Sequence, residues 1–347
     1  MSEWHPGIPE EYRNQVVTGD ARELAKRLPD ESVDLIICDP PYFRIANKEW
    51  DKQWKSIQEY ADWCLAWGKE ACRVLKKNGS AYIFGDDKNI AYVQVKLDTL
   101  DWGLINNIVW SKTNYTMRKA SPDALRSYQV QAEERILFYG KDITFPSFSE
   151  IVNPQAATPM GEYLRSERKR AGVSMQEIQK LFPSATGGLT GCVSNWELGY
   201  NFPLKEQYEK IREYLNNGKY EYLREEYEEL REEYEELRRP FFGGKHTDVW
   251  VGKLISGSNK THISEKPKWI NDRIILNSSK PDAIILDMFT GSGSALQRIK
   301  ELSRNYIAFE IDPDTAELAR KRVAATNPPL FTLDPQPEQS EMFDEQD

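Results

Sequence analysis

The stretch between residues 283 and 310 constrains the fold of this 347-residue chain more than any other part of its sequence. A short apolar run at 283–286 predicts a buried strand, and the sequence Phe-Thr-Gly-Ser-Gly follows at 289–293. The spacing of apolar residues then predicts a helix over 295–302 and a second strand over 306–310. A strand, a glycine-rich turn and a helix in this order are typical of doubly wound α/β folds, where the turn approaches a nucleoside closely.

A carboxylate after the glycine turn supports a nucleoside site. Glu310 lies 19 residues after Gly291, at the end of the next predicted strand, where it can accept hydrogen bonds from both ribose hydroxyls. A nicotinamide site is the alternative interpretation. Three points count against it: the turn lacks the third glycine of the G-x-G-x-x-G pattern, it lies near the end of the chain, and a second motif is present that a dehydrogenase does not need.

Further apolar runs predict the rest of the sheet. Residues 33–38, 80–84, 105–110 and 135–139 read as strands, and residues 57–76 carry apolar side chains at helical spacing, with Asn78-Gly79 as the expected end of that helix. The alternation predicts a Rossmann-like, doubly wound and mostly parallel sheet with helices on both faces.

The second motif is the tetrapeptide Asp39-Pro40-Pro41-Tyr42 at the end of the predicted strand 33–38. A carboxylate and a rigid backbone carbonyl, here Asp39 and Pro40, can both accept hydrogen bonds from an exocyclic base amine and draw its nitrogen toward tetrahedral geometry. Tyr42 can stack on a base that has been turned out of a duplex. The alternative is a strand-terminating turn without a chemical role.

The middle of the chain breaks the alternation. Helices are predicted at 161–171, 174–181, 190–198 and 204–215. Tyr and Leu then recur every seven residues from Tyr220 to Leu237, which predicts a charged helix that packs one stripe on the protein, in preference to a dimerising coiled coil.

The distribution of charge along the chain allows a phosphate-binding surface, although the chain is acidic overall. The net charge is −9, but two segments alone hold −10, so the rest of the chain sums to +1: residues 219–239 have nine Glu against five Lys or Arg, and residues 331–347 have six acidic and no basic residues. Residues 111–141 hold six Lys or Arg against three acids, so a local basic face for phosphates is available. The four cysteines and three histidines are scattered, which predicts neither a disulfide framework nor a metal site and fits a reducing cytoplasm. No apolar run approaches membrane-spanning length, which predicts no membrane contact.

Together these motifs resemble the β class of DNA amino-methyltransferases, in which the catalytic tetrapeptide comes first, target recognition second and the cofactor loop last. The resemblance covers about residues 14–145 and 246–325, and it implies S-adenosylmethionine as cofactor and a circularly permuted order of the methyltransferase fold. The segment 262–267 matches the family's "H-x-x-x-K-P" pattern, and 110–112 matches its "W-x-K" pattern. By this resemblance, the residues implied in cofactor binding are Asp20, Lys266, Asp287, Phe289, Gly291, Gly293 and Glu310, and Lys112 is implied near the target base.

Residues 161–215 resemble a repressor-type helix-turn-helix domain. That pattern makes Ser174 a helix cap and lets Gln176 reach a phosphate, while Trp196 belongs to the core. The turn between the two helices of the motif is lengthened by a Gly-rich stretch at 182–188. The candidates for contacts with base edges are Thr190, Ser194 and Asn195. A purely structural helical cap is the alternative.

These observations predict methylation of N6 of a flipped-out adenine in double-stranded DNA, with N4 of cytosine as the alternative and a DNA-binding regulator with a vestigial methylase part as a further one. They leave open a homodimer, a cognate restriction endonuclease and the recognition sequence. The expected parts are a catalytic part at 1–150, a helix-turn-helix insert at 158–217, a charged heptad-like helix at 218–240, a cofactor-binding part at 246–327 and an acidic disordered tail at 328–347.

Overall fold

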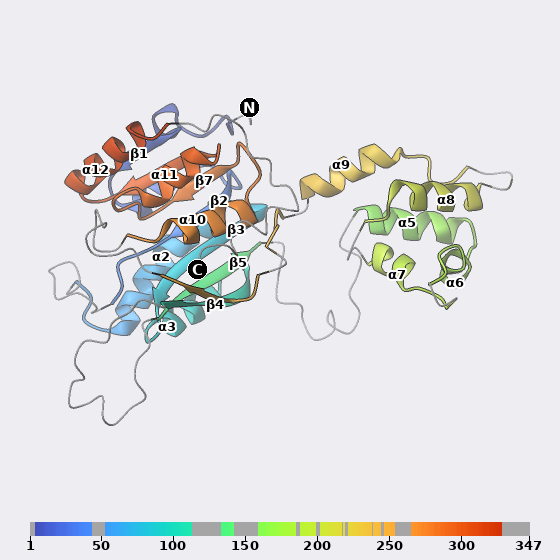
Figure 1. Cartoon of the computed structure of the whole chain (residues 1–347), viewed down its shortest axis with the longest axis horizontal. Helices are drawn as coiled ribbons and strands as arrows, with labels where there is room; N and C mark the ends of the chain where they lie inside the picture. Colours follow the sequence, from blue (N-terminus) through green and yellow to red (C-terminus); the bar gives the residue numbers. More distant parts are fainter. Residues whose placement is uncertain are drawn as a thin grey trace, which may run out of the picture. The chain divides into compact units, whose positions relative to one another are not determined.

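The computed structural model describes residues 4–43, 53–112, 133–141, 159–184, 188–198, 202–216, 218, 221–237, 239–243, 246–253 and 265–327. The chain divides into two compact units. Unit 1 comprises residues 1–144 and 239–347 and contains a sheet, and unit 2 comprises residues 145–238 and is helical in its described part (Figure 1).

In the described part of unit 1, eight strands form one sheet in the order β1-β8-β7-β2-β3-β5-β4-β6. Neighbouring strands are parallel except where β5 pairs with β3 and with β4. The predicted doubly wound, mostly parallel sheet is therefore confirmed. The strands are β1 (Gln15–Thr18), β2 (Val33–Cys38), β3 (Leu75–Asp86), β4 (Gly103–Lys112), β5 (Glu133–Gly140), β6 (Val249–Gly252), β7 (Ile284–Asp287) and β8 (Asn305–Glu310).

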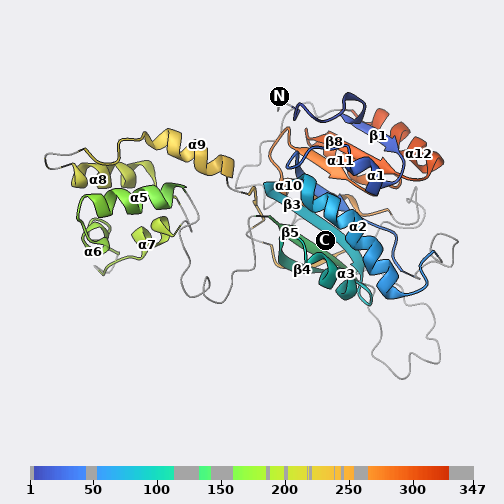
Figure 2. The ribbon, with the colours of Figure 1, turned by 180° about the vertical axis from the view of Figure 1, so that it is seen from behind.

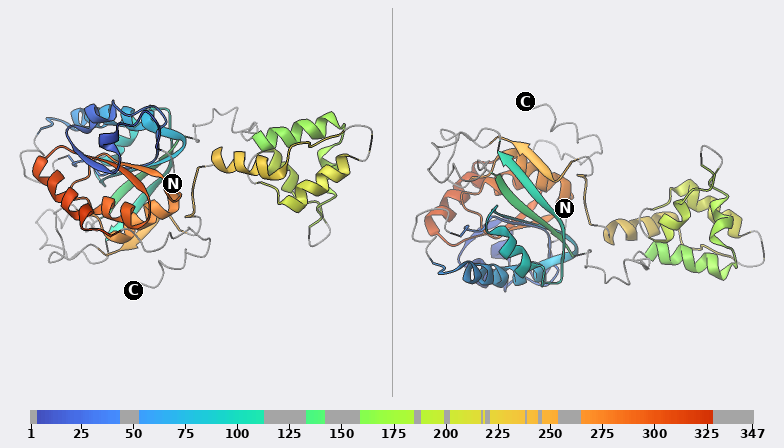
Figure 3. Two further views of the ribbon diagram at one scale, coloured as in Figure 1. Left: turned by 90° about the horizontal axis from the view of Figure 1, so that it is seen from above. Right: turned by 90° about the horizontal axis from the view of Figure 1, so that it is seen from below.

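Helices cover both faces of the sheet, and Figures 1 and 2 show the two faces in turn. Side chains of the first three helices join one apolar core and those of the last three join the other, so that the sheet lies between two layers (Figure 3). On one face are α1 (Ala21–Ala25), α2 (Ile57–Val74) and α3 (Ile90–Leu97), and on the other are α10 (Lys268–Ser278), α11 (Ser294–Glu301) and α12 (Pro313–Ala324).

The end of α2 differs from the prediction. The helix stops at Val74, and Leu75 begins β3, so Asn78-Gly79 lies inside the strand and not at a helix end. Leu75 is already paired with Val33 of β2. Pairing with the buried central strand therefore outweighs the local signal of Asn-Gly, which on its own favours a helix end or a turn.

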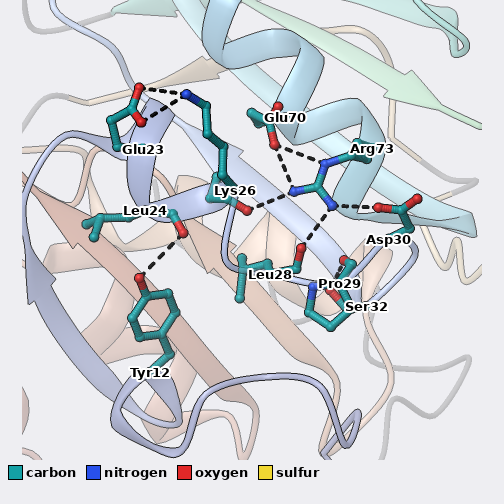
Figure 4. A network of polar contacts seen from close by, with 11 residues as sticks. Tyr12, Glu23, Leu24, Lys26, Leu28, Pro29, Asp30, Ser32, Glu70 and Arg73 are labelled. Carbon is teal, nitrogen blue, oxygen red and sulfur yellow. Dashed lines mark hydrogen bonds and ion pairs between the residues drawn. The ribbon is translucent and has the colours of Figure 1, made fainter.

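Arg73 fixes the start of the central strand β2. Its guanidinium donates to the carbonyls of Leu28 and Ala25, each at 2.9 Å, and pairs with Asp30 at 2.6 Å and Glu70 at 2.8 Å (Figure 4). The turn between α1 and β2 is thus tied to the last turn of α2. Because β2 leads to Asp39, this anchor also helps to place the candidate catalytic turn.

Unit 2 has an apolar core of its own, to which each of its five described helices contributes. Trp196 is buried in this core, and Ser174 caps α6 in a capping box with Glu177, as predicted. A buried Glu197 accepts hydrogen bonds from Arg168 at 2.5 and 2.9 Å and joins the first helix to the third. The helices are α5 (Pro159–Arg170), α6 (Met175–Gln179), α7 (Cys192–Glu197), α8 (Lys205–Leu215) and α9 (Tyr227–Leu237).

The prediction of a continuous helix over 218–240 is wrong in its first part. Residues 221–226 are not helical, and the helix begins only at Tyr227. The side chain of Asn216 bonds both the N–H and the carbonyl of Tyr222, and Arg212 donates to the carbonyl of Leu223 at 2.8 Å. Leu223 adopts a φ of 50°. Attachment to α8 therefore overrides helix propensity, while Tyr227 and Leu230 pack their stripe on the core of unit 2.

None of the helices described here is long and apolar enough to cross a membrane. Within the described residues of the chain, no three His, Cys, Asp or Glu side chains form a group that could hold a metal ion.

Candidate active site

The carboxyl ends of the strands collect polar side chains along one edge of the sheet. β1, β8, β7, β2 and β3 run in the same direction, and β4 joins them because both β4 and β3 are antiparallel to β5. Since β5 runs the opposite way, its first residues reach this same edge, and Glu134 lies opposite Asp86 and Trp110. The residues at or just after the strand ends are Asp20, Asp39, Asp86, Lys112, Asp287 and Glu310.

Asp39 and Tyr42 are held together in the turn after β2. The Tyr42 hydroxyl lies 2.9 Å from Oδ1 of Asp39, in position to donate a hydrogen bond. Downstream, Asn89 donates to the carbonyl of Phe43 at 3.3 Å and to the carboxylate of Asp86 at 3.1 Å. The two prolines of the tetrapeptide fix φ and remove two donors, so few other conformations are open to this turn.

Lys266 reaches into the same turn from the segment before α10. Its ammonium lies 2.6 Å from Oδ2 of Asp39 and 3.2 Å from Oε2 of Glu134. The Tyr42 hydroxyl is 3.1 Å from that same Glu134 oxygen. The sequence predicts that Lys266 binds the cofactor. In the structure, its ammonium group pairs with the carboxylate of Asp39, the candidate catalytic residue.

Lys112 completes the cluster from the end of β4. Its ammonium lies 2.7 Å from Oε1 of Glu134 and 4.9 Å from the centre of the Trp110 ring. Two carboxylates, two ammonium groups and one hydroxyl are thus linked through Glu134. We call Asp39, Tyr42, Lys112, Glu134 and Lys266 the amine side of the site. Their charges cancel, which is the usual condition for burying ionised groups.

Burial and charge act against each other in this cluster. Burial raises the pKa of Asp39, and the neighbouring Lys266 only partly offsets this. For Glu134 burial also acts to raise the pKa, but Lys266 and Lys112 together outweigh it, and the pKa is lowered. Burial acts to lower the pKa of Lys266, which is nevertheless raised by Asp39 and Glu134. Glu134 and Lys266 are therefore firmly ionised, and Asp39 is the better proton acceptor of the two carboxylates.

The glycine turn lies beside Asp39, because β7 pairs with β2. Gly291 has a φ of 52° and donates its N–H to Oε2 of Glu310 at 2.8 Å. Gly293 has a φ of 78°, and a Cβ added there would lie 3.0 Å from Cβ of Ala319 in α12. Both positions favour glycine, the first through its backbone conformation and the second also through close packing.

Asp287 and Phe289 stand at the start of this turn. Asp287 is 3% exposed and accepts a hydrogen bond from the N–H of Phe289 at 3.2 Å. Burial raises the pKa of Asp287 to about 8, and no described Lys or Arg pairs with it. The Phe289 ring packs against Trp63 and Trp67 of α2, with centroids 5.7 and 5.4 Å apart. We call Asp287, Phe289, Gly291, Gly293 and Glu310 the cofactor side.

Asp20 lies beyond Glu310 along the edge, because the preceding Gly19 donates its N–H to the Glu310 carbonyl at 2.9 Å. The Asp20 carboxylate caps α1 and pairs with Arg22 at 2.6 Å. Arg322 of α12 connects the two sides: it lies 2.8 Å from Glu265, the neighbour of Lys266, and 3.2 Å from Oγ of Ser292. His262, the first residue of the "H-x-x-x-K-P" segment, falls outside the described residues.

The residues predicted to contact DNA through the helical insert all belong to unit 2. Gln176 is exposed at the start of α6, while Ser194 and Asn195 lie half-buried on α7. The hydroxyl of Thr190 donates to the carbonyl of Phe182 at 2.8 Å, so this side chain has a structural partner inside the unit. These assignments stay predictions.

Sequence reasoning missed Glu134. It is the second of two adjacent glutamates just before the predicted strand 135–139, in a segment where basic residues outnumber acidic ones. The available signal was topological: an antiparallel strand starts at the edge where its parallel neighbours end, so a carboxylate at its first residues lies next to their terminal side chains.

Comparison with known proteins agrees with this geometry. The model of the N6- and N4-methyltransferase family, described as DNA methylase, matches residues 33–321, and the chain belongs to this family. It is therefore a DNA methyltransferase of the amino-methyltransferase type, for which S-adenosylmethionine is the methyl donor.

Individual relatives are similar over nearly the whole chain. The Type II methyltransferase M.HinfI of Haemophilus influenzae is 25% identical over 341 residues, covering 92% of this chain and 70% of the relative. The Type II methyltransferase M2.LlaDCHI of Lactococcus lactis subsp. cremoris is 26% identical over 325 residues, covering 89% and 88%. Among solved structures, the cytosine-N4-specific PvuII DNA methyltransferase shares the fold, with a TM-score of 0.50 and 16% identity over 88% of this chain and 85% of that chain.

Proposed function

We propose that this chain transfers a methyl group from S-adenosylmethionine to N6 of an adenine in double-stranded DNA, at a short specific sequence. The observation that carries the proposal is the position of the Asp39 carboxylate. It lies at the end of β2, beside the glycine turn after β7, and is held by Tyr42 and Lys266. An acceptor for the amine and a nucleoside site thus adjoin each other on one edge of the sheet.

The cofactor side fits the proposed methyl donor. No described residue lies within 4 Å of a Cβ added at Gly291, so a ligand can approach the backbone there. Glu310 offers a carboxylate suited to ribose hydroxyls. Asp287 is buried without a described cationic partner, which suits a ligand that carries positive charge. When bound, S-adenosylmethionine supplies an electrophilic methyl carbon on a sulfonium.

The amine side then prepares the nucleophile. The base amine is a weak nucleophile because its lone pair is delocalised into the ring. Hydrogen bonds to Asp39 and to the Pro40 carbonyl direct both N–H bonds away from the methyl group and free the lone pair for attack. The nitrogen–methyl bond would form as the methyl–sulfur bond breaks and leaves a neutral thioether, and the proton that the nitrogen must lose would pass to Asp39, whose raised pKa suits this role. Catalysis comes largely from positioning.

The choice of adenine over cytosine depends on the Asp-Pro-Pro-Tyr sequence, because this form of the motif resembles that of the adenine-specific members, whereas Ser-Pro-Pro-Tyr is typical of cytosine-specific ones. Asp39 itself would serve either amine. N4-cytosine methylation is therefore the alternative, and the two products differ in mass as nucleosides.

We also infer that unit 2 recognises the target sequence. The capping box at Ser174, the exposed Gln176 and the short helix α7 support a helix-turn-helix arrangement, in which the second helix enters the major groove. Asn195 is the residue most suited to read a base edge, because its amide can bond adenine in two places. The Type II names of the relatives favour a place in restriction-modification.

Mass spectrometry of nucleosides from unmethylated genomic DNA, treated with the full chain and S-adenosylmethionine, tests the proposed reaction. We expect N6-methyladenine. N4-methylcytosine would overturn the choice of base, and the absence of any methylated base would overturn the proposed function. Methylation-sensitive long-read sequencing of the same DNA reports the recognition site, and Asn195→Ala should relax that site if unit 2 reads it.

A further inference from the structure

Both oxygens of the Asp39 carboxylate are engaged before any base arrives. Oδ1 lies 2.9 Å from the Tyr42 hydroxyl, and Oδ2 lies 2.6 Å from the Lys266 ammonium. A target amine that donates to Asp39 must therefore share or displace one of these groups. A displaced ammonium in a buried site needs another negative partner, since an uncompensated buried charge is strongly destabilising.

Glu134 is placed to be that partner. A single oxygen, Oε2, lies 3.2 Å from the Lys266 ammonium and 3.1 Å from the Tyr42 hydroxyl. The two groups that occupy Asp39 are thus already within reach of a second acceptor. Small movements of Lys266 and Tyr42 toward Glu134 would free Asp39 without leaving either group unsatisfied.

Lys112 keeps this second acceptor in place. It binds the other oxygen of Glu134, Oε1, at 2.7 Å and leaves Oε2 facing Lys266 and Tyr42. The side chains of Lys112 and Glu134 are only 12% and 15% exposed, so the pair is not a loose surface contact. Lys112 thus acts on Asp39 through Glu134 and is not in contact with it.

We propose that Glu134 is a positioning residue for methyl transfer: its Oε2 takes up the Lys266 ammonium and the Tyr42 hydroxyl when the target amine binds Asp39. This inference rests on the proposed function and adds to it a role for a residue outside the tetrapeptide. It also changes the role of Lys266, which becomes a counter-ion shared by two carboxylates.

A purely structural ion pair predicts different behaviour from a positioning residue. Loss of a structural pair lowers the stability of the fold and leaves the catalytic steps of the remaining folded enzyme intact. Loss of a positioning residue lowers kcat at unchanged cofactor affinity, and it shifts the pH at which Asp39 ionises. The charged and titratable groups that act on Asp39 come from several elements and are Lys266, Glu134, Tyr42, Cys38, Tyr60 and Asp287.

The test measures kcat, KM and S-adenosylmethionine affinity of the full chain with unmethylated genomic DNA and radiolabelled cofactor. For Glu134→Gln we expect kcat to fall about 100-fold, the loss typical of a small misplacement of reacting groups. Cofactor affinity should stay within about twofold, because Glu134 makes no contact with the glycine turn. Asp272→Asn is the matched control, since Asp272 and Arg298 form a similarly buried pair between α10 and α11 and should affect unfolding temperature alone.

The pH profile separates the two carboxylates. Removing Glu134 removes a negative neighbour, so the pKa of Asp39 falls and the acid limb of kcat moves to lower pH. Removing the cation in Lys266→Met has the opposite effect and moves the limb to higher pH. If Glu134 and Lys266 had only a structural role, the two substitutions would not move the acid limb of kcat in opposite directions.

A second variant keeps the test decisive if Glu134→Gln folds poorly. Lys112→Met alone should lower kcat at unchanged cofactor affinity, because Lys112 acts through Glu134. Where both single variants fold, the double variant should be no worse than Glu134→Gln alone. Wild-type kcat in Glu134→Gln, additive losses in the double variant, or a loss that follows unfolding temperature would overturn the inference alone. A wild-type chain that methylates no base would overturn the proposed function, and this inference with it.

Discussion

The amine side and the cofactor side share one edge of the sheet but differ in how their charges are compensated. On the amine side, Asp39 and Glu134 each lie against an ammonium group, and all four ionised side chains are cross-linked. On the cofactor side, Asp287 and Glu310 accept hydrogen bonds from backbone N–H groups, and no described cation pairs with either.

The difference follows from what each side has to bind. A base amine is neutral, so its site needs directed acceptors and an internal balance of charge. A sulfonium cofactor is cationic, so its site benefits from carboxyl groups that no side-chain cation already neutralises and that can ionise when the cofactor binds. Variants that remove one feature at a time can show whether the two sides are energetically separate.

The largest expected effect comes from Asp39→Asn. The amide keeps the shape of the side chain but accepts through one oxygen only and takes up no proton, so methylation should fall by about 10³- to 10⁴-fold. Cofactor affinity, measured by calorimetry, should be retained, because Asp39 lies on the amine side. Substantial turnover in this variant would exclude Asp39 as the acceptor.

The two glycines should separate binding from folding. Gly291→Ala places a methyl group in open space beside Glu310, and we expect cofactor affinity to fall by about 10- to 100-fold, with about 1–2 kcal/mol of backbone strain. Gly293→Ala meets Ala319 at 3.0 Å and should chiefly lower the unfolding temperature. Equal losses of affinity and stability in both variants would contradict this division.

Cofactor affinity should depend on pH through Asp287. Its pKa of about 8 means that the carboxyl is mostly protonated at pH 7 in the free protein. A bound cation favours the ionised form, so binding releases a proton, and affinity rises with pH by at most about tenfold per unit up to about pH 8. Calorimetry in buffers of different ionisation enthalpy measures the released proton. Asp287→Asn should abolish the dependence, and a pH-independent wild type would refute it.

The positions of Asp39, Asp287 and Glu310 at strand ends could be predicted from the sequence, although the order of the strands in the sheet could not. Apolar runs that end in Asp39, Asp287 and Glu310 predict strands whose carboxyl ends meet, and the structure aligns them at one edge. Local patterns are sufficient here because these strands are central and buried on both faces, so they appear in the sequence as nearly continuous apolar runs.

The parts that the sequence did not predict depend on long-range contacts. Lys266 lies 227 residues from Asp39 along the chain, and Glu134 lies 92 residues from Tyr42. No local pattern reports that such side chains share a hydrogen-bond network. The helix start at Tyr227 was missed for a different reason: side-chain bonds from Asn216 and Arg212, only 6 and 11 residues before their partners, compete with helix propensity.

The smallest expected effect concerns the link between the two sides. Arg322 joins Glu265, next to Lys266, to Ser292 in the glycine turn. If this link couples the sides, Arg322→Met should weaken cofactor affinity and lower kcat together by a few-fold, an effect of about 1 kcal/mol on each. Arg322→Lys retains the charge without the two-pronged geometry and should show part of the loss. The double variant of Arg322→Met and Glu134→Gln distinguishes coupled from independent sides. Additive losses of kcat would mean that the two sides act independently. A smaller combined loss of kcat would mean that Arg322 acts on the amine side through the position of Lys266.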